Sequence, residues 1–486
     1  MRARLNLAAI LLTFAVVTPS TQVANPPVAQ ALPAQPGTPA SITEASVRGH
    51  MEFLASDALH GRGSGTRDEW IAAEYLASQL RRLGLAPLGD IPPGPAPAAG
   101  QPRQPRSFVQ RIELRAVEST APPTLAVGGV TLTHGKEMIV LNLGNVTRIA
   151  GSLVVYKPGM TVRAGAAVLA PDNTSADDRA AVAPASLVIV PETPAIRQRW
   201  DTAASRLPSV PARAVALPAI AAHRATMIAV DNATYAALLA LPAGARVLFD
   251  PPLKYSDTPT YTWNAVGLLP GSDTPIREVI LLSAHLDHVG MQPNTPDDDK
   301  IFNGADDDAS GSVAVLELAK ALAEGSKPKR TIVFAWFGSE ERGGHGSNYF
   351  AELPVVPTDL LIANLQFEMI GRPDPKVPPQ TLWLTGYERS NLGPELAKRG
   401  ARLVQDPHPD QSFFTRSDNI RFARKGIPAH TVSSFGLHKE YHQPNDEVRL
   451  IDFPHMTEAI RSMLEPIRWL ANDTFRPEWN PGGRPR

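Results

Sequence analysis

Residues 279–290 read VILLSAHLDHVG, in which a short apolar run, residues 279–283, is followed by His285 and Asp287. A strongly apolar run of this length, bounded by polar residues, is typical of a strand that is buried on both faces of a sheet. Similar runs occur at residues 331–336, 360–367 and 381–385, and a helical pattern spans residues 311–323. Strands that alternate with helices predict an α/β fold, with a mostly parallel or mixed sheet and helices on both faces.

Side chains that commonly bind metals follow these apolar runs. In chain order they are His285, Asp287, Glu340, Glu341 and Glu368. Two more polar segments are NGADDDASG at residues 303–311, before a predicted helix, and YHQPND at residues 441–446. In open α/β sheets ligands bind at the carboxyl ends of the strands, and buried carboxylates are costly unless a cation offsets their charge. One metal centre would explain several of these groups together.

Each group alone also has an ordinary interpretation. A single histidine after a strand is usually structural, and a glutamate pair before a turn is usually surface charge. Asp297–Asp299 is typical of a solvated loop, and Asp306–Asp308 lacks the alternating spacing of an EF-hand. Ser310 lacks the nucleophile-elbow spacing of a serine hydrolase, and no His-Glu-x-x-His motif occurs in the sequence. The metal interpretation therefore depends on the whole set.

Composition limits the classes of partner and ligand. The 486-residue chain has 47 basic and 48 acidic residues and no basic tract, so nucleic acid is not expected as a partner. Its 43% hydrophobic content suffices for two or three domains with their own cores. The sequence contains no cysteine, so it forms no disulfide, and a metal would need His, Asp and Glu ligands.

The first residues predict an export signal. Arg2 and Arg4 form a positive region, residues 5–17 form an apolar stretch, and residues 29–31 read AQA, a small-residue cleavage site. A short membrane anchor is the alternative, although the apolar stretch is short for a bilayer span. We therefore expect an exported protein, periplasmic or extracellular, with no membrane association after signal removal.

Several sequence blocks, in this order, resemble one known family. The blocks are AHLDHVG (284–290), GADDDASG (304–311), GSEE (338–341), NLQFEMIG (364–371), RSDNIRF (416–422) with GIP (426–428), and YHQPND (441–446). They are similar to the co-catalytic zinc peptidases of family M28, in particular the secreted bacterial leucyl aminopeptidase type. The segment MEFLASDALHGRGS (51–64) also resembles the entry segment of larger members.

The resemblance implies a centre of two zinc ions per chain. The implied zinc ligands are His285, Asp307, Glu341, Glu368 and His442. Asp307 would bridge the ions, with His285 and Glu368 on one and Glu341 and His442 on the other. Many members have aspartate at the position of Glu368, so this longer side chain must enter the site differently. Glu340 would be the general base and would not bind metal.

Five further residues receive supporting roles from the resemblance. Tyr441 would donate to the oxyanion, and Arg416 would position the substrate terminus or the loop. Asp287 and Asp446 would accept from the rings of His285 and His442, and so fix their tautomers. The family also implies a cis peptide bond between the bridging aspartate and Asp308.

The implied activity is hydrolysis of the N-terminal peptide bond of peptides, by a metal-bridged water with Glu340 as base. Two enzymes of the same fold stay open as alternatives, a carboxypeptidase and a glutaminyl cyclase that would keep one zinc. A non-catalytic binding module is a third alternative. Loss of Glu340 or Asp307 would have indicated such a module, and both residues are present.

The chain is expected to have five parts. Residues 1–31 are the signal peptide, and residues 32–119 are a lead-in and the N-terminal helical part of the peptidase domain. Residues 120–252 contain short β-rich runs and occupy the place of the family's protease-associated insert. Residues 253–475 form the zinc peptidase domain, and residues 476–486 a flexible tail.

Overall fold

The computed structural model describes residues 42–92, 105–144, 148–171, 181–214, 225–273 and 277–485. The predicted export signal, residues 1–31, and the first residues of the predicted lead-in, 32–41, lie outside these residues. No helix in the described part of the chain combines the length and the apolar character that crossing a bilayer requires.

The main sheet has eleven strands within the described residues. They are β1 (Ala86–Pro87), β2 (Val109–Ser119), β9 (Ser209–Ala214), β12 (Leu253–Tyr255), β13 (Thr260–Leu269), β14 (Val279–His285), β17 (Thr331–Phe337), β18 (Leu361–Phe367), β19 (Leu382–Leu384), β20 (Leu403–Gln405) and β21 (Ala429–Ser433). Their order is β12-β2-β13-β17-β14-β18-β21-β19-β20, with β1 on β13 and β9 on β2. The central pairs β14–β17, β14–β18 and β18–β21 are parallel, whereas β13–β17 is antiparallel.

Every residue of the three central strands β14, β17 and β18 is buried. Strands with both faces covered read as continuous apolar runs rather than alternating ones, which explains their sequence. The predicted runs at residues 279–283, 331–336 and 360–367 coincide with these strands to within two residues. The predicted α/β class, with a mixed sheet, is confirmed.

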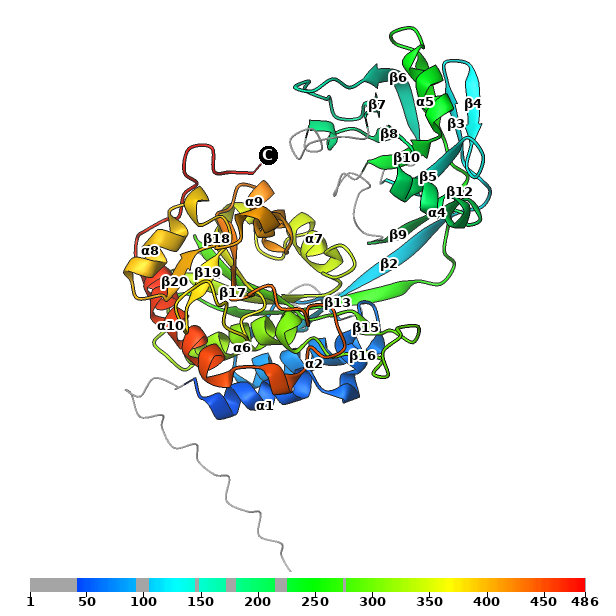
Figure 1. The fold of residues 1–486 in the computed structure, drawn as a ribbon. Coiled ribbons are helices and arrows are strands. Elements are labelled where there is room, and N and C mark those ends of the chain that lie inside the picture. Colours follow the sequence, from blue (N-terminus) through cyan, green and yellow to red (C-terminus); the bar gives the residue numbers. More distant parts are fainter. Residues whose placement is uncertain are drawn as a thin grey trace, which may run out of the picture. The chain divides into compact units, whose positions relative to one another are not determined.

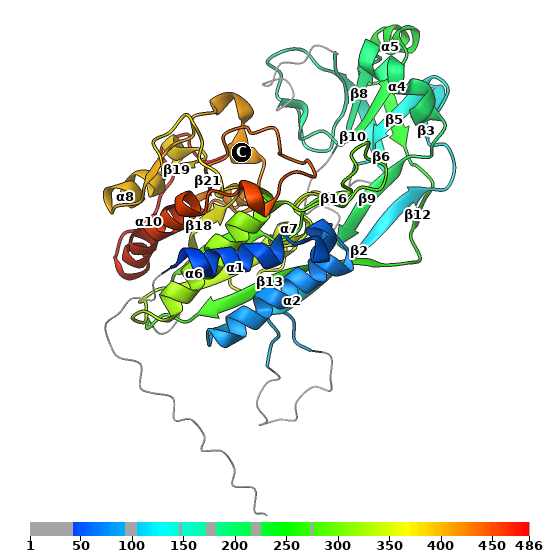
Figure 2. The ribbon, with the colours of Figure 1, turned by 60° about the horizontal axis from the view of Figure 1, so that its bottom comes forward.

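Helices pack on both faces of the main sheet (Figures 1 and 2). One layer contains α1 (Glu44–Leu54), α2 (Arg67–Arg82), α6 (Gly311–Ala323) and α10 (Phe453–Asn472). The other contains α7 (His345–Glu352) and α9 (Asn419–Arg424). The helix α8 (Leu392–Lys398) contacts α10 and β20. The helix α6 coincides with the predicted stretch.

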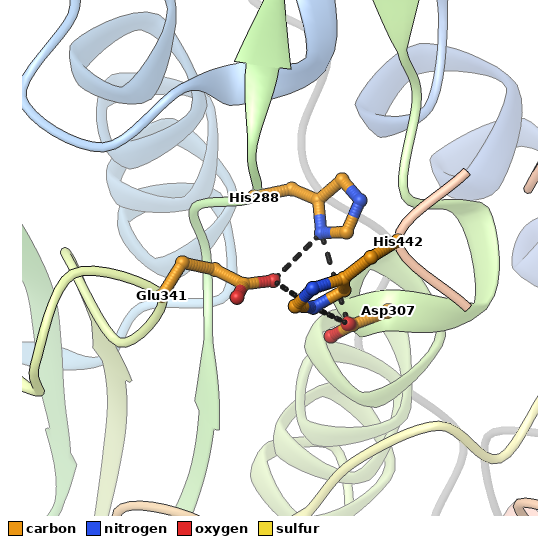
Figure 3. Close-up of side chains that lie close together, drawn as sticks. All are labelled: His288, Asp307, Glu341 and His442. Carbon is orange, nitrogen blue, oxygen red and sulfur yellow. Dashed lines mark hydrogen bonds and ion pairs between the residues drawn. The ribbon is translucent and has the colours of Figure 1, made fainter. Parts of the chain in front are cut away.

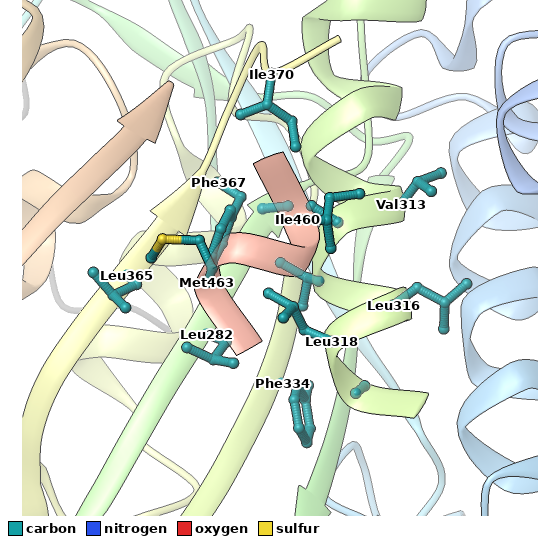
Figure 4. Packing of buried hydrophobic residues seen from close by; sticks show 14 of the residues in the cluster. Leu282, Val313, Leu316, Leu318, Phe334, Leu365, Phe367, Ile370, Ile460 and Met463 are labelled. Carbon is teal, nitrogen blue, oxygen red and sulfur yellow. The ribbon is translucent and has the colours of Figure 1, made fainter. Parts of the chain in front are cut away.

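The core between the sheet and the first helix layer is apolar (Figure 4). Leu282, Phe334 and Phe367 of the sheet pack in it with residues of α6 and α10, such as Val313 and Met463, and all five side chains are fully buried. Burial of a large apolar side chain contributes about 1.5–3 kcal/mol, so this layer fixes α6 against the strands. The segment carrying Asp307 directly precedes α6 and is therefore held in place.

A second sheet has eight strands within the described residues, in the order β4-β3-β11-β6-β7-β8-β10-β5. They are β3 (Thr124–Val127), β4 (Val130–Thr133), β5 (Met138–Asn142), β6 (Ile149–Val155), β7 (Ala167–Leu169), β8 (Leu187–Pro191), β10 (Thr226–Val230) and β11 (Arg246–Phe249). Two helices, α4 (Pro194–Ala204) and α5 (Asn232–Leu239), accompany it. The β-rich runs predicted at residues 120–252 form this sheet, except that β9 pairs with β2 of the main sheet.

Two short strands, β15 (Gly290–Met291) and β16 (Ile301–Phe302), form a separate ribbon after β14. The C-terminal segment, which the sequence predicts to be a flexible tail, makes hydrogen bonds to other parts of the chain. Trp479 donates its indole N–H to the Gly426 carbonyl at 2.9 Å, and the Arg389 guanidinium donates to the Gly483 carbonyl at 3.1 Å. These two hydrogen bonds join residues 479 and 483 to residues 426 and 389, contacts that the proline-rich and glycine-rich sequence of the segment does not indicate.

Candidate metal centre

The carboxyl ends of three parallel strands bring the candidate ligands together. His285 is the last residue of β14, Glu341 lies four residues beyond β17, and Glu368 directly follows β18. Asp307 lies in a distorted turn before α6, and His442 lies in the loop before α10. All five predicted ligands therefore meet at one edge of the main sheet.

The first set of possible ligand atoms belongs to His285, Asp307 and Glu368, which lie within 4.8 Å of one another. The Nε2 atom of His285 is 3.2 Å from Oδ1 of Asp307. His285 and Asp307 are almost fully buried, with 1% and 2% exposure. A histidine and two carboxylates form one of the donor sets that zinc accepts.

The second set shares Asp307 and contains a residue that the sequence prediction missed. His288, Asp307, Glu341 and His442 point toward a common point in Figure 3. The Nε2 atom of His442 is 3.1 Å from Oδ2 of Asp307 and 3.1 Å from Oε1 of Glu341. The Nδ1 atom of His288 is 2.9 Å from Oε1 of Glu341 and 3.8 Å from Oδ2 of Asp307.

The donor set fits a zinc ion. The Nε2 atom of His442 is buried and makes no hydrogen bond despite the nearby carboxylates, as expected for an atom directed at a cation. Zinc ligands at 2.0–2.2 Å in a tetrahedral arrangement lie about 3.4 Å apart, close to the distances within the second set. Asp307 uses Oδ1 toward one set and Oδ2 toward the other, so it can bridge two ions.

Charges within the cluster strongly perturb its titration. Burial lowers the pKa of His442, but the carboxylates of Asp307 and Glu341 outweigh it and raise that pKa to about 10. Burial raises the pKa of Asp307, but the rings of His285 and His442 outweigh it and hold that pKa well below its usual value. Burial raises the pKa of Glu368 to about 7. Without a cation the cluster therefore retains protons, which a metal would displace.

Glu340 and Glu341 are adjacent in sequence but differ in surroundings. Glu341 belongs to the second ligand set, whereas Glu340 belongs to neither set within the described residues. Both side chains line the pocket beside the cluster. Burial raises the pKa of Glu340 well above its usual value, and the carboxylates of Asp418 and Glu368 add to this effect. A desolvated carboxyl group of this kind is a stronger base than a solvated one.

Asp287 contacts the His285 ring and also two other segments, those of Ser64 and Glu340. The Nδ1 atom of His285 lies 3.2 Å from the main-chain oxygen of Asp287 and 3.7 Å from its carboxylate. That carboxylate accepts the Ser64 hydroxyl at 2.5 Å and the Glu340 N–H at 2.9 Å. The predicted support of the ring is thus made by the main chain, and the carboxylate fixes the backbone of Glu340.

Asp446 does not support His442 as the sequence interpretation had it. Among the hydrogen bonds of the described residues, its carboxylate accepts the N–H groups of Asp306 and Asp307 at 3.1 Å. Its place in sequence, four residues after His442, did not reveal this long-range contact. Asp446 therefore holds the turn that carries the shared ligand.

Asp308 stabilises the same turn from its other side. Its carboxylate accepts the N–H groups of His285, Gly311 and Met369 at 3.0–3.1 Å. The structure has the expected cis peptide bond between Asp307 and Asp308. One carboxylate thus joins the ends of β14 and β18 to the start of α6.

The pocket is lined by both charged and apolar side chains. The carboxylates of Asp307, Glu340, Glu341 and Glu368 line it, and so does an apolar, mainly aromatic cluster, which we call the aromatic wall: Met369, Trp383, Phe413, Phe435 and Tyr441. The Tyr441 ring stacks on the His442 ring, with centroids 3.9 Å apart. Arg416 is exposed at this pocket, with its guanidinium 4.9 Å from the centre of the Phe413 ring.

Other supporting residues were not identified from the sequence. The Ser417 hydroxyl donates to the Glu368 carboxylate, and Arg62, with 1% exposure, donates to the main-chain oxygens of Leu286 and Gly304. Both occur in the quoted family-like blocks. His288 also lies in such a block, three residues after His285, and that proximity was the available signal.

The part of the chain that contains the two ligand sets is similar in sequence to known proteins. The sequence profile of Peptidase family M28 matches residues 264–466. Leucine aminopeptidase 2 of Trichophyton equinum is 30% identical over 176 residues, 35% of this chain and 32% of the relative. Leupeptin-inactivating enzyme 1 of Streptomyces exfoliatus is 35% identical over 115 residues, 23% of this chain and 24% of the relative. The chain thus spans about a third or less of the length of these curated relatives.

Two solved structures are also similar. An aminopeptidase from Aneurinibacillus sp. strain AM-1 has a TM-score of 0.48 and 18% identity, over 89% of this chain and 94% of its own. A zinc aminopeptidase from Bacillus subtilis has a TM-score of 0.46 and 16% identity, over 89% of this chain and 96% of its own.

Proposed function

Residues 264–466 belong to peptidase family M28, and on that premise we propose that the chain is a zinc-dependent aminopeptidase. It would hydrolyse the N-terminal peptide bond of peptides. The observation that carries the proposal is a pair of ligand sets that share Asp307 and adjoin a pocket lined by Glu340, a carboxyl group that belongs to neither set among the described residues. The names of the curated relatives, leucine aminopeptidase among them, agree with this activity.

Two metal ions per chain follow from the shared ligand. His285 and Glu368 would hold one ion, Glu341 and His442 the other, and Asp307 would contact both. When bound, two such ions polarise a scissile carbonyl and stabilise the negative charge that develops on it. The carboxylate of Asp307 would also offset the repulsion between the ions.

Glu340 would transfer a proton from the attacking water to the leaving amine. Its backbone is held by the Asp287 carboxylate, and its side chain lies at the pocket beside both ligand sets. In the forward step Glu340 accepts a proton from the attacking water, and it then delivers that proton to the leaving amine. Both transfers need a base that shares the pocket with the substrate, as Glu340 does.

The pocket residues would bind and orient the substrate. The aromatic wall would bury an apolar side chain of the terminal residue. The carboxylates of Glu340 and Glu368 would attract its free amino group. Burial raises the pKa of Tyr441, so its hydroxyl stays protonated and can donate to the oxyanion.

A carboxypeptidase remains the second candidate because of one observation. Arg416 lies exposed at the pocket, and a guanidinium there would bind a substrate carboxylate. A glutaminyl cyclase would keep only one zinc, which the two ligand sets argue against. The N-terminal sequence favours an exported enzyme, periplasmic or extracellular.

A substrate panel tests the proposal. Purified protein is given an aminoacyl anilide, the same anilide with an acetylated amine, and an acetylated dipeptide, each with and without a zinc chelator. We expect cleavage of the free-amine anilide alone, and its loss with chelator. Cleavage of the acetylated dipeptide would instead establish a carboxypeptidase, and chelator-resistant turnover would exclude the metal mechanism.

A further inference from the structure

The turn that carries Glu340 has an unusual backbone. It follows β17, and residues 338–341 of this turn read GSEE. Ser339, directly before Glu340, has a φ of 54°, a left-handed conformation that is unfavourable for a residue with a side chain. Such a conformation persists only where the surrounding contacts determine it. We therefore asked which contacts hold this turn.

Three consecutive main-chain N–H groups of the turn each donate to a side-chain oxygen from another segment. The donor and acceptor pairs are Gly338 with Asn264 (3.1 Å), Ser339 with Glu69 (2.8 Å) and Glu340 with Asp287 (2.9 Å). All three acceptor side chains are fully buried. Asn264 lies on β13 and Asp287 follows β14, the two strands that flank β17. Glu69 lies on α2, 270 residues before Ser339 in the chain.

Glu69 uses both of its carboxylate oxygens at this place. Its Oε1 atom also accepts the Thr262 hydroxyl at 2.7 Å, and its Oε2 atom accepts the Gly65 N–H at 2.8 Å. A Cβ atom at Gly338 would lie 2.5 Å from Oε1 of Glu69 and 2.4 Å from Oγ1 of Thr262. The carboxylate therefore packs directly against the turn, and the glycine at position 338 allows this approach.

We propose that Glu69 is a positioning residue of the reaction, which places Glu340 for proton transfer by fixing the backbone of Ser339. The inference rests on the proposed aminopeptidase function, in which Glu340 is the base. Among the described residues, Glu69 belongs to neither ligand set and does not line the pocket, so it acts through Glu340. A base must lie within hydrogen-bond reach of the proton, and a misplacement of about 1 Å costs about 10²-fold in rate.

The length of the Glu69 side chain separates this role from an ordinary one. Glu69 is the third residue of α2, where a negative charge stabilises the start of the helix whatever it contacts. An aspartate at this position keeps the charge but, one methylene shorter, withdraws from the Ser339 N–H. A glutamine loses the charge but keeps an oxygen at the same reach. Glu69→Asp and Glu69→Gln therefore distinguish the two roles.

Glu317 provides the matched control. Like Glu69, it is a fully buried glutamate on a helix and accepts a serine hydroxyl, that of Ser46. It also forms an ion pair with Lys320 at 3.8 Å. These contacts join α6 to α1 and do not involve the turn of Glu340. Glu317→Asp thus removes the same methylene group from a buried glutamate elsewhere in the same domain.

The first measurement is steady-state kinetics of the zinc-loaded full chain with a free-amine aminoacyl anilide. Glu69→Asp should lower kcat by about 10–100-fold, because Glu340 moves relative to the substrate, while KM and the zinc content stay unchanged. Glu69→Gln and Glu317→Asp should keep most of the wild-type kcat. A loss in Glu69→Gln as large as that in Glu69→Asp, or an undiminished kcat in Glu69→Asp, would overturn the proposal.

The second measurement combines Glu69→Asp with Glu340→Gln. If Glu69 acts through Glu340, its change adds little once the base is absent, because the two residues then work as one unit. A general structural defect would instead multiply the two losses in kcat. Multiplied losses would therefore overturn the proposal.

The third measurement is amide hydrogen exchange at Ser339 and Glu340, and in wild-type protein it depends neither on activity nor on a variant that folds. Both amides lie outside helices and strands, yet we expect them to be strongly protected in zinc-loaded protein. Glu69→Asp should speed their exchange, whereas Glu317→Asp should not. Free exchange of the Ser339 amide in wild-type protein would show that Glu69 does not hold the turn.

These results separate the inference from the function on which it rests. Wild-type protein that cleaves no anilide would refute the aminopeptidase, and with it the catalytic part of the inference. Amide exchange would still decide whether Glu69 fixes the backbone of Ser339. An active wild-type enzyme whose kcat is unaffected by Glu69→Asp would refute the assignment of Glu69 alone.

Discussion

The two sheets of the molecule have similar cores but very different edges. In the second sheet, the described buried residues between positions 124 and 249 are apolar except for His134, Ser186 and Thr226. In the main sheet, the ends of β14, β17 and β18 bring together buried histidines and carboxylates, among them His285, Asp287 and Asp308. Within the described residues, buried charge therefore gathers in the main sheet and not in the second.

This difference indicates which sheet carries the functional site. A buried charge is costly without a partner, so a protein gathers several only where a ligand offsets them. The second sheet has no such cluster of charges in its described part, and its core is apolar. Changes at charged positions of the main sheet should therefore affect function, and changes in the second sheet should affect stability.

The largest effect should come from Asp307→Asn. The substitution removes a negative charge from both ligand sets at once, so we expect loss of both metal ions and of detectable turnover. The control is Asp231→Asn. Asp231 is the N-cap residue of α5, beside the second sheet, and asparagine can also cap a helix. Metal content by elemental analysis checks both. Two retained ions in Asp307→Asn would show that the residue is no bridge.

Glu340→Gln should lower kcat by about 10²–10⁴-fold, the usual contribution of a positioned acid–base group. Glu340 belongs to neither ligand set, so both ions should remain. Steady-state kinetics with metal analysis on the same sample separates this outcome from Asp307→Asn. Undiminished kcat would remove Glu340 from the mechanism.

Phe249→Ala should destabilise the second sheet by about 3–5 kcal/mol through cavity formation, because the ring is fully buried. Phe334→Ala should cost as much in the main sheet. The two variants differ in one respect: only Phe334→Ala, in the main sheet, should also weaken metal binding. Hydrogen exchange measures the stability of each sheet, and competition with a chelator measures the zinc affinity of each variant. Equal loss of metal affinity in both variants would show that the sheets are not functionally separate.

A smaller effect is expected from pH on metal-free protein. Burial raises the pKa of Glu368 to about 7 and the pKa values of Asp418 and Asp446 to about 6. Each folded carboxyl group binds its proton more tightly than the unfolded one, so its contribution to stability is complete below pH 4 and is lost as pH rises through 6–7. The Tm of chelator-treated protein should therefore fall between pH 5 and 7.5.

Zinc-loaded protein is the control for that measurement. Bound cations stabilise the ionised carboxylates, so its Tm should change less over the same pH range. Equal slopes with and without zinc would show that these carboxyl groups do not lie at a metal centre.

The sequence was informative where local pattern and chemistry coincide. Apolar runs located β14, β17 and β18, and residue type marked His285 and Glu368 at their ends. The sequence was less informative about which residues hydrogen-bond to one another. Asp446 was assigned to a nearby histidine, but it binds the N–H groups of Asp306 and Asp307, far from it in sequence. Hydrogen-bond partners depend on how loops pass one another, which a local pattern does not contain.

The sequence by itself determined the α/β class, the strand ends that gather metal-binding residue types, and the resemblance to family M28. These features are encoded in short-range periodicity and in residue identity. Only the tertiary structure placed β9 in the main sheet, anchored the C-terminal segment, and turned the His288 ring toward Glu341. The direction of a side chain is set by the backbone on which it is held, and for His288 that backbone is fixed by Arg62 and Ser64, more than two hundred residues away in the chain.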